Sequence, residues 1–240
     1  MRWWSGGRSE RGPAVVFLPG LGAPGYLGPW AATTATRTCA SVLDLPGWRW
    51  GRARSCAPTL DGVAGAVADW IDAHADGPVV LVGHSTGAQA VARTARARPD
   101  LVAGLVLAGP TFDPGVRRPR QVVRAALTTL PRERPAELPA VLPSYLHSGG
   151  RPLLRFLGDA LADRPERTVV DVAAPVLVLT GRHDGFAPPA WAAALAHAAG
   201  APHVVSPGAH NCCFPHPRIA DAVLEQWVRR AVPQKSDDAG

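Results

Sequence analysis

Six short apolar runs, rich in β-branched residues, recur along the chain, and longer segments with helical spacing separate them. Runs of this length with few polar positions are typical of strands that are buried on both faces of a sheet. Such strands imply a parallel sheet sandwiched between helices, which defines the α/β class. The predicted strands are residues 14–20, 39–47, 79–85, 102–110, 175–181 and 202–208.

Helical spacing is clearest between the second and third runs, where apolar residues recur from Leu60 to Ile71. Thr59 stands where an N-cap belongs and Asp61 falls in the first turn, so this segment predicts the crossover helix. The same spacing returns after residue 85 and again near the end of the chain. We therefore expect helices on both faces of the sheet.

The alternation of strands and helices is interrupted once, from Asp113 to Ala173. This stretch of about sixty residues is too long for an ordinary loop, and it contains three short helical patterns separated by prolines and glycines. It predicts a small helical cap inserted into the sheet domain. The expected domains are a core of residues 1–112 and 174–232, a cap of residues 113–173, and a disordered tail of residues 233–240.

Length and composition fit one globular domain with an insertion, since 240 residues at 47% hydrophobic can bury a substantial core. The sequence contains no apolar run of the roughly eighteen residues that cross a bilayer, and its polar start does not resemble a secretion signal. We expect no membrane partner. The four cysteines, Cys39, Cys56, Cys212 and Cys213, lack metal-ligand spacing, so free thiols in the cytoplasm are expected.

The net charge of +6 raises the question of a nucleic-acid partner. The arginines are scattered along the chain, however, and Lys235 is its one lysine, so we expect no nucleic-acid binding. The densest basic stretch, residues 115–124, is a candidate surface for an acidic partner.

One serine stands in a setting that calls for a chemical explanation. Ser85 lies between two glycines in the sequence GHSTG, at the end of a predicted strand and before a predicted helix. This is the context of the G-x-S-x-G nucleophile elbow, whose tight turn raises the hydroxyl at a helix N-terminus, where a developing negative charge is favoured. The setting predicts that Ser85 is a nucleophile.

A serine hydroxyl needs a general base near pH 7, and that base needs an acid to fix its tautomer. Asp184 follows the fifth strand and His210 the sixth, so both belong at the same sheet edge as Ser85. The chain order serine, aspartate, histidine is also the usual one for this elbow. The rival acid is Asp113, after the fourth strand, and the rival bases are His203 and His216.

With these motifs the chain resembles the α/β-hydrolase superfamily, from VVFLPGLG to the final helix. The resemblance implies an α/β-hydrolase fold with a mostly parallel sheet, helices on both faces and a helical cap. It also implies that the loop LPGLGAPG supplies half of an oxyanion hole, formed by the N–H groups of Leu21 and Thr86. Only 13 residues precede Ala14, so the N-terminal strands should be shortened or missing, with one edge strand at most.

The resemblance and the triad together predict a serine hydrolase that cleaves an ester, lactone or thioester of a small or medium-sized molecule. His210 would take the proton of Ser85, Asp184 would orient the imidazole, and no metal or organic cofactor would be required. A serine at the elbow argues against the dehalogenases and epoxide hydrolases of the superfamily, which use an aspartate.

Several alternatives use the same residues. One is a thioesterase with an acyl carrier protein as partner, another is a cofactor-free lyase or cyclase, and a third is a perhydrolase. A ligand-binding receptor built on the hydrolase fold belongs to a different class of function, which labelling of the serine would distinguish.

Overall fold

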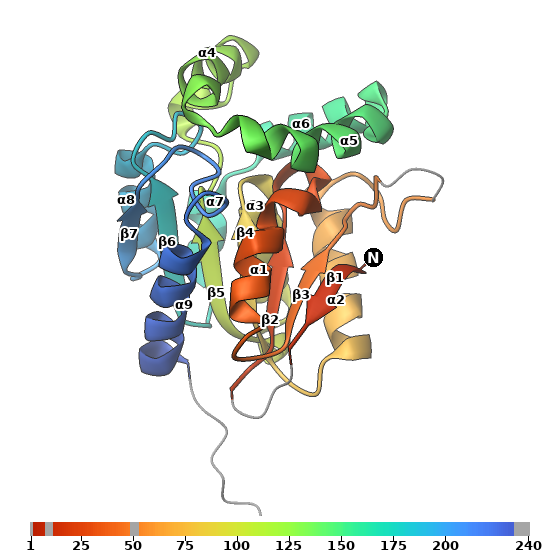
Figure 1. Cartoon of the computed structure of the whole chain (residues 1–240), viewed down its shortest axis with the longest axis vertical. Coiled ribbons are helices and arrows are strands. Elements are labelled where there is room, and N and C mark those ends of the chain that lie inside the picture. The colour runs from red at the N-terminus through yellow and green to blue at the C-terminus, as the bar shows by residue number, and fades with distance from the viewer. Residues whose placement is uncertain (1, 8–11, 49–52, 233–240) are drawn as a thin grey trace, which may run out of the picture.

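The computed structural model of the chain describes residues 2–7, 12–48 and 53–232. These residues form a seven-stranded sheet with the order β1-β3-β2-β4-β5-β6-β7 (Figure 1). β1 (Arg2–Gly6) runs antiparallel to β3 (Ala40–Leu43) at one edge, and the other neighbours pair in parallel. The other strands are β2 (Val15–Leu18), β4 (Val79–His84), β5 (Val102–Ala108), β6 (Val176–Gly181) and β7 (His203–Ser206).

The six apolar runs of the sequence coincide with β2 to β7, which confirms the α/β class and the parallel sheet. β1 is the single edge strand that the short N-terminal segment allows. Side chains alternate across the sheet, as β2 illustrates: Val15 and Phe17 enter one apolar core, and Val16 and Leu18 enter the other. Both faces of the sheet are therefore buried.

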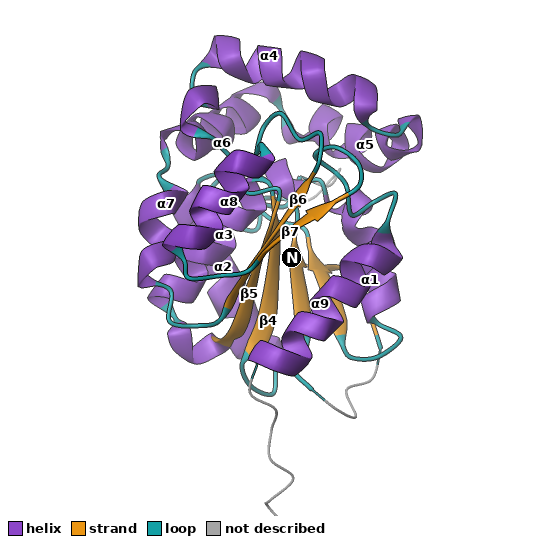
Figure 2. Ribbon diagram, turned by 90° about the vertical axis from the view of Figure 1, so that its left-hand side faces the viewer, coloured by secondary structure: helices purple, strands orange, loops and turns teal. Residues whose placement is uncertain are grey.

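Helices cover the two faces, as Figure 2 shows with the sheet nearly edge-on. α1 (Gly28–Thr34) and α9 (Pro217–Ala231) lie on one face, and α2 (Leu60–His74), α3 (Thr86–Ala97) and α8 (Pro189–Ala198) lie on the other. The predicted N-cap is confirmed, since Thr59 Oγ1 accepts the Gly62 N–H at 3.1 Å. In the part of the chain that the structure describes, every helix is too short or too polar to cross a membrane.

Residues 113–173 fold into helices and short 3-10 turns, over the segments where the sequence predicted helices. α4 (Pro119–Thr129), α5 (Leu138–Ser148) and α6 (Gly150–Ala162) lie together across one end of the molecule, and α7 (Pro165–Thr168) leads back to the sheet (Figures 1 and 2). Thr129 Oγ1 accepts the N–H of Gly185, in the loop after β6, at 2.9 Å. This segment, which we call the cap, therefore covers the carboxyl ends of the parallel strands.

Candidate active site

The loops that follow four parallel strands carry the candidate residues. Leu21 follows β2, Ser85 follows β4, Asp184 follows β6 and His210 follows β7. Parallel strands present their carboxyl ends at one edge of a sheet, which is where open α/β folds bind ligands. The fold therefore gathers residues that are up to 189 positions apart in the chain at one edge.

Ser85 occupies a sharp turn between β4 and α3. Its backbone has a φ of 56° and a ψ of −125°, a conformation that is rare for a residue with a side chain. The turn leaves no room for neighbours with side chains: a Cβ on Gly83 would lie 2.4 Å from Val91, and one on Gly87 would lie 2.5 Å from the carbonyl oxygen of Leu18. This geometry agrees with a nucleophile elbow, in which the serine opens a helix.

Asp184 and His210 form a buried hydrogen-bonded pair. Asp184 Oδ2 accepts the proton of His210 Nδ1 at 2.7 Å, while Oδ1 accepts the backbone N–H groups of Phe186 and Ala187 at 2.8 and 2.9 Å. Burial alone would lower the pKa of His210, but the charge and hydrogen bond of Asp184 outweigh it, and the pKa is raised. In the neutral imidazole the proton therefore stays on Nδ1, and Nε2 is free to accept another.

The residues that flank the Ser85 turn lie near this pair. The Ser85 N–H donates to the carbonyl of Ala108 at the end of β5 at 2.9 Å, and the ring of His84, the preceding residue, lies 4.8 Å from the ring of His210. The rival residues lie elsewhere: Asp113 caps a 3-10 turn by accepting the N–H of Gly115, His203 begins β7, and His216 precedes α9. The structure thus brings Asp184, and not Asp113, to His210.

The expected oxyanion donors lie beside the elbow, but one of them is engaged. Leu21 sits in a 3-10 turn, Gly20–Gly22, and its N–H donates to the hydroxyl of Thr86 at 2.8 Å. Thr86 is the first residue of α3, where backbone N–H groups have no partner within the helix. The sequence did not predict that a side chain would occupy the Leu21 N–H.

Sequence reasoning also missed three residues that join the cap to the base. The Asn211 N–H donates to Glu133 at 2.9 Å, and its side-chain amide donates to Glu137 at 2.8 Å. Burial, reinforced by the charge of Glu133, raises the pKa of Glu137 to about 7. The available signal was in the sequence: these glutamates are the two acidic residues among the arginines of residues 114–158.

The remaining candidates belong to the core. Cys212 and Cys213 are buried free thiols with sulfur atoms 3.9 Å apart, and Trp48 and Trp191 pack in the apolar core of the α2, α3 and α8 face. From the sequence alone, the indoles of Trp48, Trp50 and Trp191 are candidates to line an apolar pocket; Trp50 lies outside the described residues. Within the described ranges, His, Cys, Asp and Glu side chains form no group of three that would hold a metal ion.

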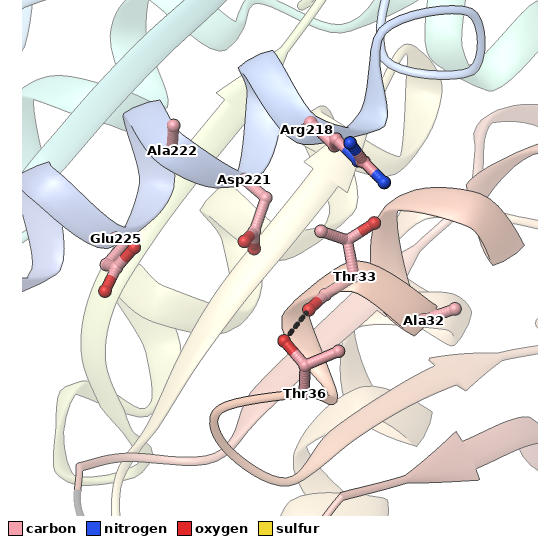
Figure 3. Close-up of a pocket in the computed structure, with 7 residues that line it drawn as sticks. All are labelled: Ala32, Thr33, Thr36, Arg218, Asp221, Ala222 and Glu225. Carbon is pink, nitrogen blue, oxygen red and sulfur yellow. Dashed lines mark hydrogen bonds between the residues drawn. The ribbon is translucent and has the colours of Figure 1, made fainter.

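A groove of about 540 Å³ lies between α1 and α9, as Figure 3 shows. Thr33 and Thr36 line one side, and Arg218, Asp221 and Glu225 of α9 line the other. The Asp221 carboxylate already accepts hydrogen bonds from Arg37 at 2.6 Å and from Thr34 at 2.8 Å. The groove shares no residue with the candidate site, and its polar groups join the two helices to each other.

The fold and the nucleophile elbow define an α/β hydrolase, and comparison with known proteins agrees with this class. The chain belongs to the α/β hydrolase family, whose model matches residues 15–226. It is 44% identical over 88 residues to the lipase LipV of Mycobacterium tuberculosis (strain ATCC 25618 / H37Rv). That match covers 36% of this chain and 34% of the lipase, so the chain spans about a third of the length of this relative.

Solved structures extend the likeness of fold over nearly the whole chain. A thermophilic esterase from Thermogutta terrifontis, solved with malate bound, is 20% identical with a TM-score of 0.71, over 96% of this chain and 93% of the esterase. Est816, described as an N-acyl homoserine lactone degrading enzyme, is 20% identical with a TM-score of 0.76, over 94% of this chain and 95% of Est816. At these identities the likeness shows the fold alone.

Proposed function

We propose that the protein is a serine hydrolase that cleaves an ester, lactone or thioester of a small or medium-sized molecule through an acyl-enzyme intermediate. The observation that carries the proposal is the strained Ser85 turn beside a buried Asp184–His210 pair with a 2.7 Å hydrogen bond. A nucleophile, a base with a free Nε2 and an acid that fixes its tautomer are the groups that acyl transfer needs. No cofactor enters this scheme.

In the proposed reaction, Ser85 Oγ attacks the acyl carbon and its proton passes to His210 Nε2. The backbone N–H groups of Leu21 and Thr86 stabilise the oxyanion, which requires the Thr86 hydroxyl to release the Leu21 N–H that it now accepts. As the bond from the acyl carbon to the leaving group breaks, His210 protonates the departing oxygen or sulfur, which is the ring oxygen in a lactone, and the acyl group stays on Ser85. Attack by a water molecule, deprotonated by His210, releases the acid and restores the serine.

The experiment is covalent labelling with a fluorophosphonate, followed by mass spectrometry. We expect the intact protein to gain the mass of the probe on Ser85, and Ser85→Ala to lose both labelling and turnover of a panel of esters, lactones and acyl thioesters. Replacement of His210 should cost several orders of magnitude in kcat, because the members of a triad act as a unit. Labelling that persists in Ser85→Ala would overturn the assignment, and an unlabelled intact protein would favour a ligand-binding receptor.

A second candidate, a thioesterase that acts on an acyl carrier protein, is favoured by the charge of the cap. Residues 117–158 contain eight arginines and two glutamates, so they account for the whole net charge of +6 and leave the rest of the chain balanced. Arg120 and Arg124 are exposed on α4, at the strand-end side of the molecule. A basic surface beside the site would attract an acidic partner that delivers an acyl thioester.

The test compares one acyl group on an acidic carrier protein and on a small free thiol. Arg120→Gln with Arg124→Gln should slow hydrolysis of the carrier-bound thioester and leave the free thioester unaffected. Arg229→Gln with Arg230→Gln, at exposed positions on α9, is the matched control. Equal rates on both substrates in all variants would exclude a carrier partner.

We propose the cytoplasm as the compartment, which is supported by the four free cysteines.

A further inference from the structure

Hydrogen bonds through two buried side chains link the loop after β2 to the loop after β7. The Gly20 N–H donates to Tyr26 Oη at 2.6 Å, and this oxygen lies 2.8 Å from His84 Nδ1. On its other side, His84 Nε2 lies 2.9 Å from the backbone carbonyl oxygen of His210. Tyr26 is 3% exposed and His84 is 1% exposed, so water does not compete for these groups.

The two end groups, the Gly20 N–H and the His210 carbonyl, set the direction of every hydrogen bond in this series. A carbonyl oxygen only accepts, so the proton of His84 must be on Nε2 and point at His210. Burial, followed by the charge of His210, lowers the pKa of His84 to about 3, so its ring is neutral and Nδ1 accepts. Tyr26 therefore donates its one proton to His84 Nδ1, and its oxygen accepts the Gly20 N–H. Only this one arrangement of protons gives every polar atom in the series a hydrogen-bond partner.

Both ends of this series of hydrogen bonds lie at the candidate site. Gly20 precedes Leu21, an expected oxyanion donor, and it lies against the nucleophile: a Cβ on Gly20 would be 2.9 Å from Ser85 Oγ. At the other end, the carbonyl belongs to His210, the base whose ring is already fixed by Asp184. His84 itself is the residue before Ser85. This series of hydrogen bonds thus connects the oxyanion loop, the elbow and the base.

We propose that Tyr26 and His84 are positioning residues, which hold the oxyanion loop and the backbone of His210 at a fixed separation around Ser85. The inference rests on the proposed hydrolase function and deepens it. Oxyanion stabilisation depends on donors that are already in place before charge develops, so a loop that moves by a fraction of an ångström loses part of the rate. Asp184 restrains the ring of the base, and His84 restrains its main chain.

Three variants distinguish the contributions of the two ends of this hydrogen-bond series. Tyr26→Phe removes one hydroxyl and leaves the Gly20 N–H and His84 Nδ1 without partners. His84→Asn places an amide near the Nδ1 position and keeps a partner for Tyr26, whereas His84→Gln places an N–H near Nε2 and keeps a partner for the His210 carbonyl. Thr94→Val is the matched control, because the buried Thr94 hydroxyl bonds Ala64 and Ala90 carbonyls at 3.1 and 3.2 Å within the α2–α3 pair.

The readouts are the second-order rate constant for fluorophosphonate labelling of Ser85, and kcat and KM for a short-chain ester. For Tyr26→Phe we expect labelling and kcat to fall about tenfold or more, because two buried polar groups lose their partner and the oxyanion loop loses its attachment, with KM unchanged. Each His84 variant should retain part of the rate, since each preserves one of the two contacts. Thr94→Val should lower the melting temperature and leave kcat unchanged.

The outcomes distinguish this inference from the proposed function. An intact protein that takes no label would overturn both, whereas an intact protein that labels at the same rate as Tyr26→Phe and both His84 variants would overturn the inference alone. A variant that fails to fold leaves the intact protein to be examined by imidazole ¹H–¹⁵N correlation. That spectrum should show His84 protonated at Nε2; protonation at Nδ1 would reverse the deduced direction and overturn the inference.

Discussion

Replacement of Asp184 by asparagine should inactivate the protein without unfolding it, because the surroundings of the side chain fix the orientation of the new amide. Asp184 Oδ1 accepts two backbone N–H groups, from Phe186 and Ala187, and the asparagine oxygen must take that place. Turning the amide over would leave both donors unpaired, at about 1–3 kcal/mol each. The NH₂ group is therefore left facing His210 Nδ1.

Two donors cannot share one hydrogen bond, so the proton of His210 must move from Nδ1 to Nε2. An imidazole protonated at Nε2 cannot accept the proton of Ser85, and we expect kcat to fall by a factor of about 10⁴. This factor corresponds to about 5.4 kcal/mol of lost transition-state stabilisation. The two retained N–H contacts should keep the melting temperature close to that of the unmodified protein.

The assay measures kcat/KM for a short-chain ester and the rate of fluorophosphonate labelling, with circular dichroism as the test of folding. Asp113→Asn is the matched control: the oxygen of asparagine can still accept the Gly115 N–H, so activity should not change. A loss of less than about tenfold in folded Asp184→Asn would refute the tautomer argument. An equal loss in Asp113→Asn would move the role of the acid to that residue.

Four further predictions follow from the contacts of the site. Gly20→Ala should abolish labelling and turnover, because the new Cβ would lie 2.5 Å from Ser85 Cβ; full activity would show that this loop yields. In a profile of kcat/KM against pH, the acid limb should have its midpoint above 6.5, since the pKa of His210 is raised and the base acts when neutral; a midpoint below 6.5 contradicts this. Because the pKa of Glu137 is raised to about 7 in the folded protein, its protonated carboxyl stabilises the fold below pH 4.5, and this contribution is lost as the pH rises to about 7. Across that range, the free energy of unfolding from denaturant titrations should therefore increase for Glu137→Gln relative to the unmodified protein. Across a series of acyl esters, kcat/KM should rise by up to roughly fourfold per methylene over a few carbons and then level off if, as we propose, the cap closes an apolar chamber over Ser85; a steady rise to long chains would argue against that chamber.

The sequence was sufficient for the features that local patterns encode. The apolar runs predicted β2 to β7 because strands buried on both faces leave few polar positions, and Thr59 predicted the start of α2 because an N-cap hydroxyl acts within three residues. The glycines around Ser85 predicted a turn without room for side chains, which the structure bears out. The placement of Asp184 after β6 and His210 after β7 needed only the rule that parallel strands end at one edge.

Contacts between distant segments were beyond reach, since one sequence holds no record of which side chains meet. Nothing in the sequence pattern connected His84 with Tyr26, 58 positions earlier. Thr86 was expected to contribute its backbone, yet its hydroxyl accepts the N–H of Leu21. Asn211 is one residue from His210, but its partners lie 74 and 78 positions away in the cap.

The hydrogen bonds of Asn211 to Glu133 and Glu137 set a condition on motion. They attach the turn between α4 and α5 to the residue beside the base, so the cap cannot swing away at this point unless both hydrogen bonds break or the His210 main chain moves with it. Any displacement of this turn that breaks both hydrogen bonds would release the main chain of Asn211, the residue next to His210. At this point of the molecule, therefore, the position of the cap and the position of the main chain beside His210 are coupled.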